Sequence, residues 1–228
     1  MVRMIVNKSF PLIFFVVLAL LSFIVYLYKK HMSKNAKYLV IDTEATGLHP
    51  TKNCLIQVGV ILADKDLNIL QEQVWEITAD PHSEIDPVAM DINGIDLNNR
   101  GFQISQLQFC KEFINLVKDN FEQSPIVIAQ FYPFDYAYLD AIFCKNGFDS
   151  RDINEVLGNN FIDTKSLAYY FNYKAEQNNL AIPFPITSLS KEGGLADKLE
   201  VFDFQAHNAL GDCRATLEVL KKYKIAGF

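Results

Sequence analysis

Two carboxylates lie two positions apart at the end of a short apolar run. The run is residues 38–42; Asp42 is its last residue, and Glu44 follows two positions later, before a turn at Thr46-Gly47. Such a run predicts a buried strand. Side chains alternate along a strand, so both carboxylates point to one face of the sheet. On its own, an acidic pair of this kind is typical of a solvated strand end, and a chemical role requires further residues.

Two more segments carry residues that could complete such a site. Asp135 follows a predicted strand over residues 126–129 and lies at the start of a predicted helix, where the helix dipole favours an acid. His207 and Asp212 lie at the beginning of the last predicted helix, about residues 208–222. Taken alone, Asp135 is interpreted as a helix-opening acid and His207 as a cap or surface residue.

Together the three segments indicate a metal-dependent hydrolytic site. Four carboxylates that cluster without a cation would repel one another, and hard cations such as Mg²⁺ take oxygen ligands. Two such ions stabilise the attacking and leaving oxygens of a phosphoryl displacement. A neutral histidine nearby can take the proton of the attacking water. Spacing in the sequence does not establish that the three segments meet in space.

The elements that would position these residues form an α/β pattern. Strands are predicted at residues 38–42, 55–62, 70–78, 126–129 and 160–163, and a helix is expected to open at Asp86-Pro87. Strands first, followed by alternating strands and helices, predict a mixed sheet of about five strands flanked by helices. Residues 178–190, which include two prolines, predict an irregular loop.

The motifs, in this order, resemble those of the DEDDh 3′–5′ exonucleases, which include ribonuclease T and the proofreading subunit of bacterial replicative polymerases. Asp42-Thr43-Glu44 with Thr46-Gly47-Leu48 resembles the first motif, Phe134-Asp135 the second, and His207 with Asp212 the third. Residues 85–95 and 161–164 resemble two further segments of the family. The likeness extends over about residues 37–223, which is nearly all of the chain beyond its apolar N-terminus.

The resemblance implies a ribonuclease H-like fold and a catalytic mechanism with two Mg²⁺ or Mn²⁺ ions. Four residues would hold the metal ions, namely Asp42, Glu44, Asp135 and Asp212. His207 would act as the general base, and hydrolysis would release nucleoside 5′-monophosphates from the 3′ end. Ala45 and Leu48 match positions that contact the terminal nucleotide in the family. Packing of Leu48 on the core is an equal alternative.

The second motif departs from the family pattern. Gln130 and Phe131 occupy the positions at which relatives usually have His-Asn. Phe131 could stack on a nucleotide base, although core packing is the commoner role of such a residue. Ala45 also replaces the usual Thr or Ser. Neither change removes a metal ligand, but both leave the substrate preference open.

Charge and composition narrow the class of substrate. A chain that is 50% hydrophobic and 21% charged is not wholly disordered. Residues 1–37 hold six of the 21 basic residues and no acidic one, so residues 38–228 carry a net charge of −12. This charge disfavours a protein that grips long duplexes through many phosphates. It is compatible with the binding of single-stranded DNA or RNA 3′ ends beside bound metal ions.

The four cysteines lie far apart and form no zinc or disulfide pattern, which favours a cytosolic setting. The alternatives to a general exonuclease are an RNA-specific 3′-end trimmer and a membrane-anchored module that binds nucleic acid without catalysis. A homodimer is a further expectation.

The N-terminus predicts a membrane anchor. Residues 9–28 hold no charge, and twenty residues of helix span about 30 Å, the thickness of the hydrocarbon core. A buried helix and a cleaved signal peptide are the alternatives. The lysines that follow the run favour a cytoplasmic catalytic domain in a single-pass membrane protein. The predicted domains are an anchor and linker over residues 1–36 and an exonuclease domain over residues 37–228.

Overall fold

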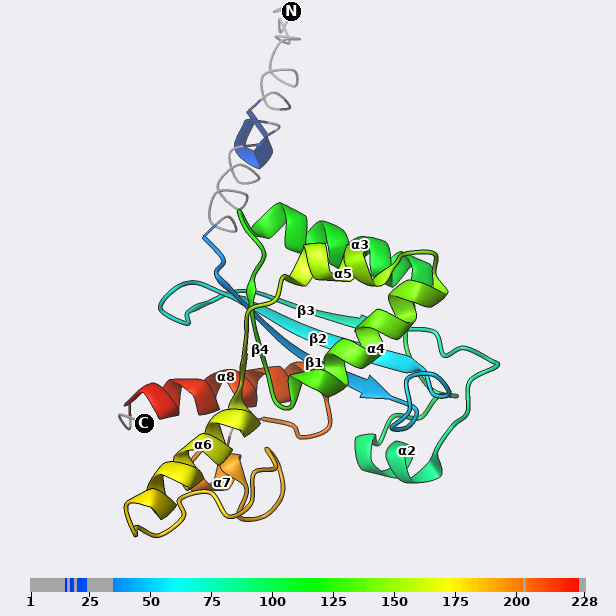
Figure 1. Cartoon of the computed structure of the whole chain (residues 1–228). Coiled ribbons are helices and arrows are strands. Elements are labelled where there is room, and N and C mark those ends of the chain that lie inside the picture. The colour runs from blue at the N-terminus through cyan, green and yellow to red at the C-terminus, as the bar shows by residue number, and fades with distance from the viewer. Residues whose placement is uncertain (1–14, 16, 19, 24–34, 203, 226–228) are drawn as a thin grey trace, which may run out of the picture.

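The core of the computed structural model is a mixed five-stranded sheet (Figure 1). The structure describes residues 15, 17–18, 20–23, 35–202 and 204–225. The order of the strands in the sheet is β3-β2-β1-β4-β5. Their bounds are β1 Tyr38–Ala45, β2 Leu55–Ala63, β3 Ile69–Glu76, β4 Ile126–Ala129 and β5 Phe161–Asp163.

The first three strands pair antiparallel, whereas β4 runs parallel to β1 and β5 runs parallel to β4. This arrangement is the mixed sheet of a ribonuclease H-like fold, and it confirms the α/β architecture expected from the sequence. Because β1, β4 and β5 are parallel, their carboxyl ends lie at one edge of the sheet, the edge toward which the predicted acidic residues extend.

Helices cover both faces of the sheet. Their bounds are α2 Pro87–Asn93, α3 Gln106–Asn120, α4 Tyr132–Lys145, α5 Ser150–Leu157, α6 Thr164–Gln177, α7 Leu195–Lys198 and α8 Ala209–Ile225. Helices α3, α4 and α5 pack in one core with Leu39 and Ile41 of β1, and α8 packs against Val40 on the opposite face. All nine residues of β2 are buried, because a strand covered on both faces has no solvated side.

Local sequence explains where several helices begin. The side chain of Asp86 accepts a hydrogen bond from the Val88 amide, and Pro87 occupies the first turn of α2, as the sequence predicts. Asp163, the last residue of β5, caps α6 by accepting a hydrogen bond from the Ser166 amide. Such caps satisfy amides that the first helical turn leaves unbonded. Asp163 thus both ends β5 and caps the helix that follows it, α6.

The N-terminal prediction requires correction. Within the described residues, no helix combines the length and the apolar character that crossing a membrane requires. The prediction of a transmembrane helix over residues 9–28, and of a single-pass membrane location with a cytoplasmic catalytic domain, is therefore wrong for the chain that the structure describes. That prediction rested on the uncharged length of residues 9–28, which matches the thickness of a bilayer, and on the lysines that follow.

Of residues 9–28, only residues 15, 17–18 and 20–23 are described, and they are helical. The other residues of this segment lie outside the description. The boundary between the two predicted domains, at residues 36 and 37, stays a prediction because residues 24–34 are also outside it.

Candidate active site

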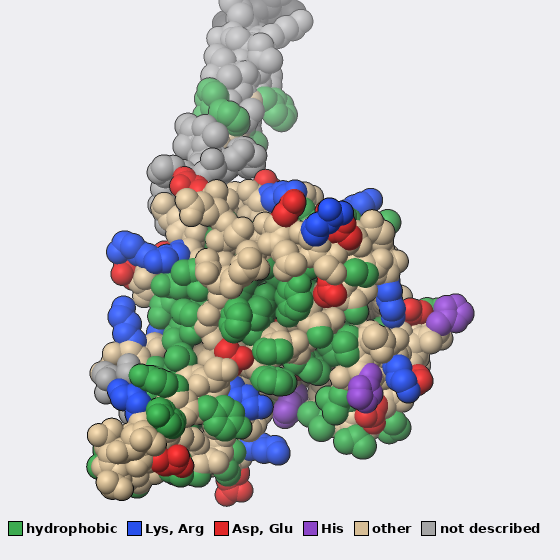
Figure 2. Space-filling model, viewed as in Figure 1, with side chains coloured by type: hydrophobic (Ala, Val, Ile, Leu, Met, Phe, Trp, Pro, Cys, Tyr) green, Lys and Arg blue, Asp and Glu red, His purple; other side chains and the backbone are tan. Residues whose placement is uncertain are grey.

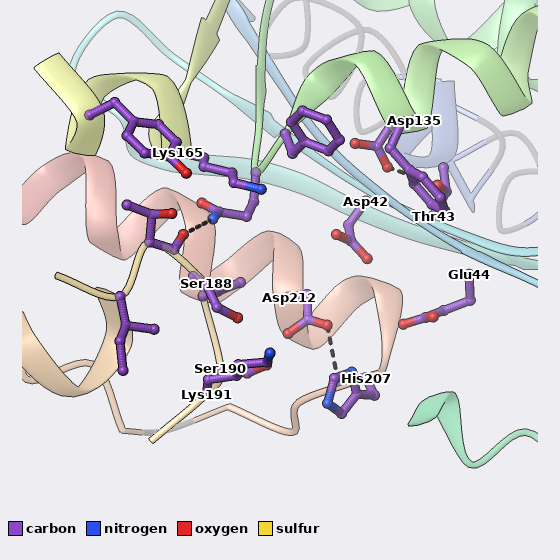
Figure 3. Close-up of a pocket in the computed structure, with 17 residues that line it drawn as sticks. Asp42, Thr43, Glu44, Asp135, Lys165, Ser188, Ser190, Lys191, His207 and Asp212 are labelled. Atoms are coloured by element: carbon purple, nitrogen blue, oxygen red, sulfur yellow. Dashed lines mark hydrogen bonds between the residues drawn. The ribbon is translucent and has the colours of Figure 1, made fainter. Parts of the chain in front are cut away.

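Three segments distant in the sequence bring their carboxylates together at one edge of the sheet. Asp42 and Glu44 come from β1, and Asp212 comes from the first turn of α8. One carboxylate oxygen of each of these three residues lies within 4.8 Å of the others. Asp135, in the first turn of α4, lines the same pocket, whose volume is about 560 Å³ (Figure 3). The structure thus answers the question that sequence spacing left open.

The position of Asp212 depends on a close approach between α8 and the sheet. Gly59 of β2 lies opposite Asp42 of β1. A Cβ atom at Gly59 would lie 2.5 Å from the backbone of Ala209 and Leu210. The Ala209 amide also donates to Gln57 Oε1 at 2.9 Å. The start of α8 is therefore fastened directly onto β2, so that Asp212 faces Asp42.

Asp135 is buried and held by a neighbour of the two β1 acids. Its Oδ1 accepts a hydrogen bond of 2.8 Å from the hydroxyl of Thr43. The side chain of Thr43 points to the opposite face of β1 from Asp42 and Glu44, because side chains alternate along a strand. The residue between the two acids of the first motif thus connects that motif to the second.

The turn that leads to Asp135 is shaped by Asp163. Phe131 precedes α4 in the left-handed region, with φ 70°, a conformation that non-glycine residues seldom adopt. The carboxylate of Asp163 accepts hydrogen bonds from the amides of Phe131 at 3.3 Å and Tyr132 at 3.0 Å. Sequence reasoning assigned Asp163 to a family-like stretch but not to this role. An acid at the end of the predicted strand 160–163 was the available signal.

His207 lies beside Asp212 at the mouth of the pocket (Figure 3). It is exposed, its φ is 61°, and its amide donates to Asp212 Oδ2 at 3.0 Å. The other carboxylate oxygen, Asp212 Oδ1, is buried and has no hydrogen-bond partner among the described residues. A buried oxygen without a donor fits a cation ligand, because such a group is costly to leave unpaired. The donor set, all carboxylate oxygens, is that of a hard divalent ion.

The pocket raises the pKa of every carboxyl group in the cluster. Burial raises the pKa of Asp42 well above its usual range, and the charges of Asp135, Asp212 and Glu44 raise it further. Burial and the charge of Asp212 raise the pKa of Glu44 to about 7. Burial raises the pKa of Asp135 to about 8 and that of Asp212 to about 6. Without positive charge the cluster retains protons near neutral pH, and a divalent cation would displace them.

The predicted substrate-binding residues lie in different places. Phe131 lines the pocket and is 47% exposed, so it does not pack in the core. Leu48 is 68% exposed and therefore does not pack in the core either. Ala45 is buried, and its carbonyl accepts a hydrogen bond from Asn93 Nδ2. Neither Leu48 nor Ala45 lines the pocket that holds the carboxylates.

Sequence reasoning missed the side of the pocket that faces the acids. Lys165 and Tyr169 of α6 line this side, together with the loop of residues 186–191. Gln130 holds the loop in place, because its Nε2 donates to the Thr187 carbonyl at 2.8 Å and its Oε1 accepts from the Thr164 hydroxyl. The loop was predicted as irregular, but nothing in its sequence indicates that it returns to the pocket. Lys165 directly follows the family-like stretch 161–164, which was the available signal.

The fold and this acidic pocket define a ribonuclease H-like domain with a candidate metal site, and comparisons with known proteins place the chain in a family. The model of the RNase T exonuclease family matches residues 39–220. The chain belongs to this exonuclease family. Membership confirms the prediction, made from the motifs, of a DEDD-type 3′–5′ exonuclease family.

Two curated relatives are similar over different lengths. A PolC-type DNA polymerase III of Thermotoga petrophila is 26% identical over 194 residues, which cover 83% of this chain and 12% of that protein. An oligoribonuclease of Actinobacillus pleuropneumoniae is 54% identical over 43 residues, 18% of this chain and 23% of that enzyme. The chain thus spans less than a quarter of the length of these relatives.

Solved structures of exonuclease I share the fold. One has a TM-score of 0.68 and 19% identity over 83% of this chain and 41% of the other. Escherichia coli exonuclease I in complex with a dT13 oligonucleotide has a TM-score of 0.66 and 20% identity, again over 83% of this chain and 41% of the other. At this identity the likeness concerns the fold.

Proposed function

We propose that this chain is a divalent-metal-dependent 3′–5′ exonuclease that removes nucleoside 5′-monophosphates from single-stranded or short nucleic-acid ends. The observation that carries the proposal is the convergence of Asp42, Glu44 and Asp212, from two distant segments, to within 4.8 Å, with Asp135 in the same pocket. Placing four buried or half-buried acids together is unfavourable unless a function requires it. Membership in the exonuclease family supports the same conclusion.

Asp42, Glu44, Asp135 and Asp212 would hold two ions, Mg²⁺ or Mn²⁺. The ions would supply positive charge for the attacking and leaving oxygens of the phosphodiester. His207 would act as the general base that accepts the proton of the attacking water, since it lines the pocket and is exposed to solvent. Its amide is bonded to Asp212, and this contact keeps the base next to the carboxylates.

A single strand is the substrate class that the net charge favours. Exonuclease I, which shares the fold, has been solved with dT13 and dA16 oligonucleotides. An RNA-specific trimmer is the second candidate, favoured by the 43-residue likeness to an oligoribonuclease. A module that binds without catalysis is less favoured, because all five motif residues are present and lie around one pocket. The homodimer stays a prediction.

The test compares RNA and DNA single strands of the same sequence, labelled at the 5′ end, with the full chain in Mn²⁺, Mg²⁺ or EDTA. We expect a ladder that shortens from the 3′ end, mononucleotide products and no cleavage in EDTA. The rates on the two sugars decide between the general exonuclease and the RNA trimmer. Binding without cleavage in every metal would favour the non-catalytic module and contradict the proposal.

A further inference from the structure

One face of α6 combines exposed aromatic rings with a basic residue. Lys165, Tyr169 and Tyr173 follow one another at intervals of four residues, so they form one strip that winds slowly around the helix. Both tyrosines are more than half exposed. Figure 2 shows hydrophobic and basic side chains next to each other over this part of the molecule. Exposed aromatic residues interleaved with lysine are typical of surfaces that bind single strands.

The strip begins inside the candidate active site. Lys165 and Tyr169 line the pocket that holds the four carboxylates. The ammonium group of Lys165 lies 4.3 Å from the centre of the Phe131 ring, which lines the same pocket. From Lys165 to Tyr173 the helix rises by about 12 Å. The strip therefore leads from the acidic cluster outward along α6.

Charge distinguishes this side of the pocket from the opposite side. Residues 80–96, which include α2, contain five acidic residues and no lysine or arginine. Two of these acids pair with lysines of other segments, Glu84 with Lys52 and Asp80 with Lys145, and the other three remain as a net negative charge. Helix α6 contains two lysines and one glutamate. In Figure 3, Lys165 and Glu44 lie on opposite sides of Asp212. A polyanionic strand that leaves the pocket toward α2 would meet repulsion, whereas one that follows α6 would not.

We propose that the strip of Lys165, Tyr169 and Tyr173 is the path of the single strand on the 5′ side of the nucleotide being removed. Lys165 contacts a phosphate, and the two tyrosine rings stack on successive bases. This inference rests on the proposed exonuclease function. It adds a prediction that the function alone does not make, namely that affinity grows with strand length until the strand covers α6.

The experiment measures the binding of 5′-fluorescein-labelled oligonucleotides of 2 and 8 nucleotides to the full chain by fluorescence anisotropy in EDTA. The strip lies outside the carboxylate cluster, so its contribution persists without metal. We expect Tyr169→Ala and Tyr173→Ala each to weaken binding of the 8-mer about tenfold. The 2-mer is too short to reach Tyr173, so the affinity ratio of 8-mer to 2-mer falls in Tyr173→Ala. Lys165→Gln should reduce the salt slope of 8-mer binding by about 0.7.

Tyr170→Ala is the matched control. Tyr170 belongs to the same helix and is exposed to a similar extent, but its ring contacts Lys174 and it lies off the strip. We expect this variant to bind like the wild type. Equal affinities for the 8-mer in wild type, Tyr169→Ala and Tyr173→Ala would overturn the path, even if the chain cleaves strands. Tyrosine-dependent binding without cleavage in Mn²⁺ would keep the path and refute the exonuclease.

Discussion

Asp212 combines a buried oxygen that has no hydrogen-bond donor in the described part of the chain with two neighbouring carboxylates. One of its oxygens accepts the His207 amide, and the other is buried without a partner in the described part of the chain. Its carboxylate lies beside those of Asp42 and Glu44. These contacts satisfy neither the free oxygen nor the mutual repulsion, so the arrangement fits the proposed role of Asp212 as a metal ligand and does not serve stability.

Replacing single carboxylates should separate activity from folding. We expect Asp42→Asn and Asp212→Asn each to abolish metal-dependent release of mononucleotides, because each removes a ligand. Thermal unfolding in EDTA should occur at the same or a higher temperature than in the wild type, because one repelling charge is removed. Asp91→Asn, an exposed acid of α2, is the control. Unchanged turnover in either site variant would refute the metal assignment.

At His207 the imidazole can be removed with little change to the backbone. Its φ of 61° is in the left-handed region, which asparagine tolerates better than most residues. His207→Asn therefore preserves the backbone and its hydrogen bond to Asp212 while removing the imidazole. We expect kcat to fall by about 10²–10⁴-fold, with thermal unfolding unchanged. His49→Asn, at an exposed loop position, should retain full activity. A near-normal kcat in His207→Asn would exclude the general-base role.

The sequence allowed the acidic residues to be predicted, but not the residues that face them. Asp42, Glu44, Asp135 and Asp212 were predicted because their motifs, in this order, resemble those of an exonuclease family; strand alternation by itself places only Asp42 and Glu44 on one face. Lys165 and Tyr169 are separated from those motifs in sequence, and their approach to the pocket depends on how α6 and the loop 186–191 pack. Such tertiary packing leaves no local pattern, and only the structure reveals it.

At the scale of secondary structure, the contact between α8 and β2 positions the third motif. The helix begins against Gly59, directly opposite Asp42 in the sheet. Strand and helix boundaries were predicted within a few residues. For example, β3 ends at Glu76 instead of residue 78, and α8 begins at Ala209 instead of residue 208. The close approach at Gly59 was not predicted, because a glycine within a buried strand does not identify the element that packs on it.

A methyl group at Gly59 should therefore disturb both the fold and the site. Gly59→Ala places a Cβ atom against the backbone of Ala209 and Leu210, which must move. We expect a loss of about 1–3 kcal/mol in the free energy of unfolding, together with a lower kcat, because Asp212 moves with α8. Urea denaturation and steady-state kinetics measure the two effects.

Gly101→Ala is the corresponding control, because a Cβ atom there meets no neighbour within 4 Å. It should leave both quantities within about 0.5 kcal/mol and twofold of the wild type. If Gly59→Ala proves as stable and active as Gly101→Ala, the close packing of α8 does not position Asp212.

For the molecule as a whole, the acidic pocket links stability to pH and to metal. The pKa of Glu44 is raised to about 7 and that of Asp135 to about 8, whereas unfolded carboxyl groups titrate near 4. Between about pH 4 and pH 8 the folded state thus binds more protons than the unfolded state. By linkage, the free energy of unfolding of the metal-free protein falls as pH rises through this range.

Divalent cations should reverse this loss. We expect chemical denaturation in EDTA to show lower stability at pH 8 than at pH 5. Mn²⁺ or Mg²⁺ should stabilise the protein by about 2.7 kcal/mol at one hundred times the dissociation constant. At one fixed ion concentration the stabilisation should be larger at pH 8 than at pH 5, because the ions displace fewer protons at pH 8. Metal stabilisation of equal size in Asp42→Asn would show that the ions bind elsewhere.

Hydropathy was a weaker guide at this scale than charge. The apolar segment of residues 9–28 led to the prediction of a membrane span, which the described helices do not support. The net charge of −12 over residues 38–228, in contrast, is compatible with a site that holds cations, and the structure concentrates four acids in one pocket. Composition gives the net charge of the chain but not where in the fold the acidic residues cluster.

The carboxylate of Asp163 holds the amides of Phe131 and Tyr132 and caps α6. The helix that carries Asp135 and the helix that carries Lys165 therefore start from the same anchor. Under the proposed function and strand path, strand binding and turnover are coupled through Asp163, so a change at position 163 should alter both. Engineering that aims to lengthen or shorten the preferred oligomer without slowing hydrolysis should act further along α6, near Tyr173, where that coupling no longer reaches.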